Sequence, residues 1–134
     1  MADEIALELA GHRFVATLFA DLAPLACQAL VARLPLEGPA IHAMWSGPLC
    51  LLNGVDLGDL PVENATTYLG PGNLVYHPRH KEIGVAYEPT QFKEPIGPVY
   101  VTLLGRLAGD LSALVEVGRR LQYTGAQRLV VRWA

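Results

Sequence analysis

The chain has 134 residues, of which 51% are hydrophobic and only 17% are charged, against roughly 25% charged in an average soluble domain. This length corresponds to a single domain, residues 1–134, which is large enough to bury its own core. The net charge of −3 argues against a nucleic-acid partner, because nucleic-acid-binding proteins carry a basic stripe. The surplus of apolar residues leads us to expect a homo-oligomer that buries some of them between subunits.

The cysteines and the N-terminus bear on the cellular compartment. Cys27 and Cys50 lie in the apolar segments LACQAL and GPLCLL, where free cysteines behave as small buried hydrophobic residues. The N-terminus does not resemble a signal peptide, and no apolar run reaches the ~18 residues of a membrane span. We therefore expect a cytoplasmic protein without a membrane partner.

The N-terminal third predicts a hairpin followed by a helix. Glu4–Leu9 and Arg13–Leu18 each alternate apolar and polar residues, and a Gly-His turn joins them. The spacing of apolar residues then becomes helical and continues to Leu34-Pro35. Asp21 is a suitable capping residue for this helix.

The middle of the chain predicts a series of short strands and loops. We expect strands at Pro39–Gly47, Leu49–Leu52, Leu74–His77 and Glu82–Tyr87. Proline, glycine and polar residues between them predict a loop at Asn53–Leu60, irregular or short edge structure at Pro61–Leu69, and an extended loop at Glu88–Pro98.

The C-terminal third predicts a strand, a helix and a final strand. Val99–Leu107 is apolar on both faces, which indicates a central strand. Asp110 can cap a helix whose inward residues are Leu111, Leu114, Val115, Gly118 and Leu121. Gln127–Trp133 alternates, with Leu129, Val131 and Trp133 facing inward. The order β-β-α, several strands, α, β favours a mainly β fold, a closed antiparallel barrel whose open ends two helices cover.

Several segments carry a family resemblance that covers nearly the whole chain. They are IHAMWSGPL at Ile41–Leu49, PVENATTY at Pro61–Tyr68, GPGNLVYHP at Gly70–Pro78 and EIGVAYEPTQF at Glu82–Phe92. In this order and spacing, the chain resembles a family of small bacterial proteins of unassigned function with a cyclophilin-like fold. The resemblance implies a barrel of about eight strands with a helix at each end.

The resemblance does not imply prolyl isomerisation. True cyclophilins carry a Phe-His-Arg motif and a Gln-Gly-Gly segment on the outer face of the barrel. Here His12-Arg13-Phe14 lies in the opening hairpin, and the sequence contains no Gln-Gly-Gly. Because a fold alone does not transfer a function, we do not expect peptidyl-prolyl isomerase activity.

Two groups of residues suggest a binding cleft. Trp45 offers a large apolar wall with one N–H donor, and His42 can donate, accept or titrate near neutral pH. Glu63, beside Asn64 in a loop, could anchor a polar ligand, and Tyr76, Tyr87 and Phe92 could form part of the wall. The alternatives remain open: Trp45 and these aromatic residues could belong to the core, His42 could be a satisfied edge residue, and Glu63-Asn64 could be an ordinary turn.

His77, His80 and Glu82 form an H-x-x-H-x-E run that offers metal-ligand types. Adjacent strand positions point to opposite faces, so these three side chains converge only if the loop folds back. Short motifs of this kind also match by chance, and Arg79–Lys81 has the composition of a solvated hairpin tip. We therefore expect no metal and no other cofactor.

These observations predict a protein that binds a small polar or aromatic metabolite in a cleft of the barrel. The expected lining residues are His42, Trp45, Glu63, Tyr76, His80 and Glu82. If the protein is an enzyme, His42 with Glu63 or Glu82 would be the acid–base set. The alternative is a homo-oligomeric assembly module without catalysis. A prolyl isomerase or a metal-dependent enzyme is less favoured than either.

Overall fold

A computed structural model describes residues 3–134, within which the chain forms two helices and thirteen strands. Eight antiparallel strands form a closed barrel, in the order β2-β1-β13-β3-β4-β8-β7-β12, and β12 returns to pair with β2. This confirms the predicted barrel. Its strands are β1 (Glu4–Leu9), β2 (His12–Leu18), β3 (Leu36–His42), β4 (Leu49–Leu52), β7 (Asn73–His77), β8 (Glu82–Ala86), β12 (Val101–Leu107) and β13 (Gln127–Trp133).

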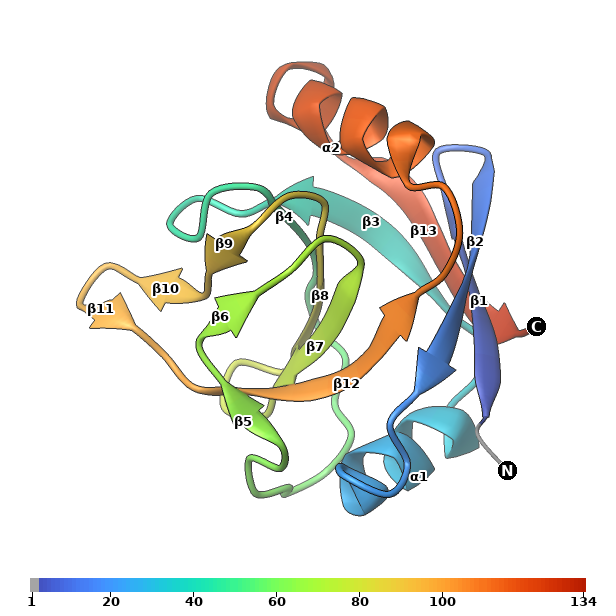
Figure 1. The fold of residues 1–134 in the computed structure, drawn as a ribbon, viewed down its shortest axis with the longest axis vertical. Helices are drawn as coiled ribbons and strands as arrows, with labels where there is room; N and C mark the ends of the chain where they lie inside the picture. Colours follow the sequence, from blue (N-terminus) through green and yellow to red (C-terminus); the bar gives the residue numbers. More distant parts are fainter. Residues whose placement is uncertain (1–2) are drawn as a thin grey trace.

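The two helices lie at opposite ends of the barrel. In Figure 1, α2 (Ser112–Thr124) lies at the top and α1 (Pro24–Ala32) at the bottom. The buried residues of α2 follow helical spacing, and its Gly118 packs directly against the ring of Tyr87. Within residues 3–134, neither helix combines the length and apolar character that a membrane crossing would need.

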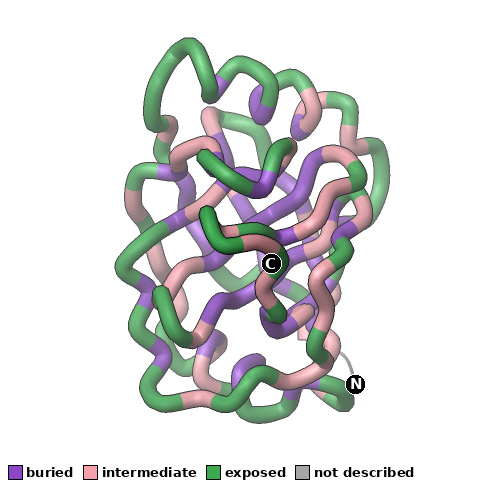
Figure 2. The backbone as a smooth tube through the Cα atoms, turned by 90° about the vertical axis from the view of Figure 1, so that its left-hand side faces the viewer, coloured by how far each residue is buried: buried purple, intermediate pink, exposed green. Residues whose placement is uncertain are grey.

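The core fills the inside of the barrel. Figure 2 shows buried residues concentrated along the inner strands and exposed residues along the outer loops. Every barrel strand contributes at least one inward apolar side chain. The largest fully buried side chains include Ile5, Leu7, Leu18, Leu49, Leu74, Tyr76, Ile83 and Leu104.

The seam between β12 and β2 depends on a glycine. Gly105 is opposite Leu18 in the register of the two strands. A Cβ atom at this position would collide with the backbone of Thr17 and Leu18. A residue without a side chain therefore lets the two strands approach closely enough to close the barrel.

Five strands of two residues each lie beside the barrel. They are β5 (Ala65–Thr66), β6 (Tyr68–Leu69), β9 (Thr90–Gln91), β10 (Lys93–Glu94) and β11 (Gly97–Pro98). β6 pairs with β9 and β10 pairs with β11, so Glu88–Pro98 is not simply an extended loop as expected. In Figure 1, β9, β10 and β11 extend to the left of the barrel.

Three local expectations need correction. β3 begins at Leu36 and ends at His42, because Leu36–Ala40 pair with β13 and the chain then bends, with the Ala43 amide bonded to the Leu49 carbonyl. Helix α1 begins at Pro24, and no side chain at its N-cap position forms a capping hydrogen bond, so Asp21 does not cap it. Trp133 is 51% exposed, since it occupies the last position of β13, beyond the buried part of the strand.

Candidate functional site

A pocket of about 260 Å³ opens between the Ala43–Ser46 bend, the tip of the β7–β8 hairpin and strand β10. Its apolar lining residues include Ile41, Leu51 and Phe92. Its polar lining residues include three of the predicted cleft, His42, His80 and Glu82, and also Glu94. Trp45 stands at the pocket with 55% of its surface exposed, so its indole is open to a ligand.

His42 is held in a fixed orientation. Its Nδ1 lies 2.8 Å from the Ala43 carbonyl oxygen, which can only accept, so this nitrogen carries a proton. Its Nε2 lies 2.7 Å from the hydroxyl oxygen of Tyr87. Burial is the main cause that raises the pKa of the Tyr87 hydroxyl, which therefore stays protonated and can donate to Nε2. Both ring nitrogens of His42 thus have protein partners, and a ligand would meet the ring itself.

Ser46 joins the bend that carries Trp45 to the strand that carries Glu94. The Ser46 hydroxyl donates to the Lys93 carbonyl over 3.0 Å, and the Lys93 amide donates back to the same oxygen over 2.8 Å. Thr90 also donates a hydrogen bond to the Ser46 carbonyl. These bonds fix the position of β10 against the pocket, although Ser46 and Lys93 lie far apart in sequence.

The β7–β8 hairpin places His77 and Glu82 side by side. The two residues are partners in the antiparallel register, so their side chains lie on the same face. The turn between them is closed by a 2.8 Å bond from the Lys81 amide to the His77 carbonyl, with Lys81 at a φ of 54°. The His80 ring packs edge-on against the His77 ring at a centroid distance of 4.5 Å.

Two histidines and two glutamates converge at this point. The distances are 3.5 Å from His77 Nδ1 to Glu82 Oε1, 3.8 Å from His77 Nε2 to Glu94 Oε1, and 3.1 Å from His80 Nδ1 to Glu94 Oε1. His77 is only 2% exposed. Nevertheless, His77 Nδ1 and Glu94 Oε1 are buried without a hydrogen-bond partner. Leaving such groups unsatisfied costs about 1–3 kcal/mol each, so the arrangement needs an explanation.

Two of the six expected lining residues lie elsewhere, which corrects their placement in the cleft. Glu63 reaches the start of α1, where its carboxylate accepts hydrogen bonds from the Ala26 amide at 2.8 Å and the Leu25 amide at 3.3 Å. Tyr76 is fully buried, and its hydroxyl donates to the Val55 carbonyl over 2.6 Å. The interior position of Tyr76 on β7 follows from strand alternation, and Glu63 stabilises a helix end.

Sequence reasoning missed Glu94 as a pocket residue, because Glu94 lies in a segment expected to be a loop. Phe92, one of the aromatic residues that the sequence offered as a cleft wall, does line the pocket. The sequence pattern that pointed to this cluster was the H-x-x-H-x-E run, which contains His77, His80 and Glu82. Nothing in the sequence near Glu94 indicates that its carboxylate reaches the two imidazoles.

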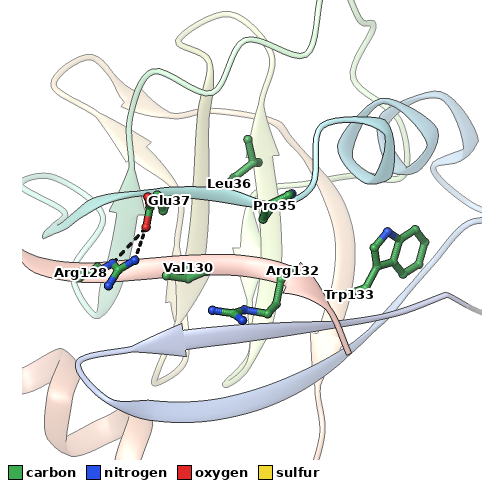
Figure 3. A pocket seen from close by; sticks show the side chains of 7 residues that line it. All are labelled: Pro35, Leu36, Glu37, Arg128, Val130, Arg132 and Trp133. Atoms are coloured by element: carbon green, nitrogen blue, oxygen red, sulfur yellow. Dashed lines mark hydrogen bonds and ion pairs between the residues drawn. The ribbon is translucent and has the colours of Figure 1, made fainter.

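A second hollow, of about 490 Å³, lies on the outer face of β3 and β13. Figure 3 shows Arg128, Val130 and Arg132 on one strand and Glu37 on its neighbour, with Trp133 at the end. Arg128 forms an ion pair with Glu37, and Arg132 lies 2.7 Å from Glu8. The arginines of this hollow are therefore already paired with glutamates. In the first pocket, by contrast, Glu94 Oε1 has no hydrogen-bond partner.

The cysteines do not supply a nucleophile. Both are free and buried, as expected. Burial raises the pKa of Cys27 to about 11, with a further contribution from Glu63, and burial raises that of Cys50 to about 12. Thiolate chemistry near neutral pH requires a lowered pKa, so neither residue is suited to it.

Comparisons with known proteins agree with the fold. Residues 5–132 match the family described as "Protein of unknown function (DUF3830)". The solved structure of McbB in complex with tryptophan matches 96% of this chain with a TM-score of 0.80 and 21% identity, and the match covers 44% of McbB. The hypothetical protein AF2241 from Archaeoglobus fulgidus matches 99% of this chain and 95% of its own length, with a TM-score of 0.71 and 18% identity. A search of curated proteins found no match.

Proposed function

The chain belongs to the DUF3830 family of proteins of unknown function, and we propose that this member binds a small polar or aromatic metabolite in the pocket beside Trp45. One observation carries the proposal: a half-exposed indole, apolar side chains and a group of polar side chains line the same pocket. Binding sites for small molecules combine an apolar lining with a few convergent polar groups in this way.

The chemistry of the lining side chains narrows the kind of ligand. Glu82 and Glu94 present carboxylates, which bind a protonated amine or several hydroxyl groups. Trp45 and Phe92 present aromatic surface, which favours a ring. The volume of about 260 Å³ suits a molecule of amino-acid size. McbB, which shares the fold, was solved with tryptophan, and such a ligand has both a ring and an amine.

Fluorescence and thermal unfolding test this proposal. In a Trp133→Phe variant, Trp45 is the only tryptophan, so its emission reports the pocket alone. We expect one or more aromatic amines in a metabolite panel to change this emission and raise the melting temperature. The Trp45→Ala variant should lose the stabilisation, and Trp133→Ala should keep it. A panel that leaves emission and melting temperature unchanged would contradict the proposal.

A second candidate, assembly into a homo-oligomer, is favoured by exposed apolar side chains on strand β6 and in the turns before β11 and β12. Tyr68, Ile96 and Tyr100 are all largely exposed. Contacts between copies of the chain commonly bury such side chains. Sedimentation velocity should show a species larger than the monomer, which Ile96→Asp shifts toward monomer. A monomer at all concentrations would remove this candidate.

A further inference from the structure

His77, His80 and Glu82 have the spacing of a metal site, and Glu94 lies beside both imidazoles. One potential ligand atom from each of His77, His80 and Glu82 lies within 4.8 Å of the other two. Glu94 Oε1 lies 3.1 Å from His80 and 3.8 Å from His77. Donors around a tetrahedral zinc ion, at bond lengths near 2.0–2.2 Å, are separated from one another by roughly 3.4 Å. Small side-chain adjustments would therefore place these donors around one ion.

Hydrogen bonding within the cluster does not account for this spacing. His77 Nδ1 and Glu94 Oε1 are buried and have no hydrogen-bond partner, although other donors and acceptors lie within 4 Å. An ion bound through Nδ1 would satisfy the orphaned atom of His77, since buried water or an ion usually does so for such groups.

The backbone holds the donors in place. His77 and Glu82 are cross-strand partners at the end of the β7–β8 hairpin. Glu94 is fixed by the bonds between Ser46 and Lys93 next to it in the chain. Phe92 packs edge-on against the His77 ring at 5.4 Å, which restricts the rotation of that imidazole. The donors are thus preorganised by strands and packing, as in metal sites that bind tightly.

From this geometry we propose that His77, His80 and Glu82, with Glu94 beside both imidazoles, bind a divalent first-row transition-metal ion such as Zn²⁺. Mixed imidazole and carboxylate donors favour such ions over Mg²⁺ and Ca²⁺, which prefer oxygen ligands. His80, Glu82 and Glu94 also line the pocket, so an ion here is reachable from it. Water could then complete its coordination, whereas a protonated amine would compete with the ion for Glu82 and Glu94.

Titration with Zn²⁺ tests the site directly. The full chain, stripped with a chelator, should bind one Zn²⁺ per chain in calorimetry, and its melting temperature should rise. Co²⁺ should give the visible absorption of an ion with nitrogen and oxygen ligands, while Mg²⁺ at the same concentration should change neither signal. Since no organic ligand is involved, this outcome is separate from the metabolite screen, and either can fail without the other.

Variants assign the ligands. His80→Ala replaces a side chain that is 47% exposed, so we expect it to fold, and Zn²⁺ affinity should fall at least tenfold. Glu94→Gln should also weaken binding, and it keeps the shape of the buried side chain. His12→Ala removes an exposed histidine at the start of β2 and should bind Zn²⁺ as the parent does. The proposal is overturned if the chain takes up no stoichiometric Zn²⁺, or if His80→Ala and Glu94→Gln bind like His12→Ala.

Discussion

Two glutamates at different places on the barrel have opposite hydrogen-bonding environments. Glu63, at the end covered by α1, accepts two backbone N–H groups at the start of that helix. Glu94, beside the Trp45 pocket, has a buried oxygen without a hydrogen-bond partner near two imidazoles. Both belong to loops or short strands, and both contact residues distant in sequence. The difference teaches that a satisfied carboxylate contributes to stability, whereas an unsatisfied one indicates a site for another molecule or ion.

Among the variants that test this difference between Glu63 and Glu94, Glu63→Ala should change the free energy of unfolding most. The substitution leaves the first amides of α1 without their acceptor and removes a negative charge from the positive end of the helix. We expect the free energy of unfolding to fall by about 2 kcal/mol. Urea unfolding measures this change, and Zn²⁺ binding at the pocket should be unaffected.

The matched control for this variant is Glu116→Ala. Glu116 is exposed on α2 and pairs only with Arg120 one turn away, at 3.7 Å. Its removal should cost less than about 0.5 kcal/mol. If Glu63→Ala were no more destabilising than Glu116→Ala, the assignment of Glu63 as a helix cap would be wrong.

A smaller effect of opposite sign is expected from Glu94→Gln in metal-free protein. Replacing this carboxylate, whose Oε1 is buried without a hydrogen-bond partner, by a neutral amide should raise the free energy of unfolding by up to about 1 kcal/mol. Urea unfolding with and without a chelator measures it. Clear destabilisation of the metal-free variant would show that Glu94 is a structural residue, as Glu63 is.

The smallest expected difference is in thiol labelling, because Cys27 near α1 and Cys50 near the pocket should react alike. Cys27 lies on α1, and Cys50 lies on β4 opposite His42. With pKa values of about 11 and 12, both thiols are almost entirely protonated at pH 8. A colorimetric disulfide reagent should therefore label neither in the native protein and both after unfolding. Fast labelling of Cys50 alone would indicate that the pocket side opens locally.

The barrel was predictable where hydrophobic alternation is continuous. Glu4–Leu9 and Gln127–Trp133 have the bounds that their period of two predicts. Ile5, Leu7, Leu9, Leu129 and Val131 pack into the core, whereas Trp133 at the end of its strand does not. The strands of two residues could not be found this way, since two residues carry no period. Their pairing depends instead on contacts such as that between Ser46 and Lys93, which no local pattern contains.

The site was predictable in part for a related reason. The sequence predicts that the H-x-x-H-x-E run spans a strand and a loop, and that its side chains converge only if the loop folds back. The hairpin register makes His77 and Glu82 partners across two strands, so the same residues converge. An explicit pairing of the two predicted strands would have shown this. The place of Glu63 at α1, 37 residues from Ala26, and of Glu94 at the histidines could be seen only in three dimensions.

The close approach of β12 to β2 at Gly105 has a consequence for self-association. A closed wall presents few unpaired main-chain amides along its rim, and these are the groups to which a foreign strand adds in amyloid-like stacking. Restoring one methyl group at Gly105 would force the two strands apart and expose both of their borders. The absence of a side chain at Gly105 therefore leaves no free strand edge at this seam to which a foreign strand could add.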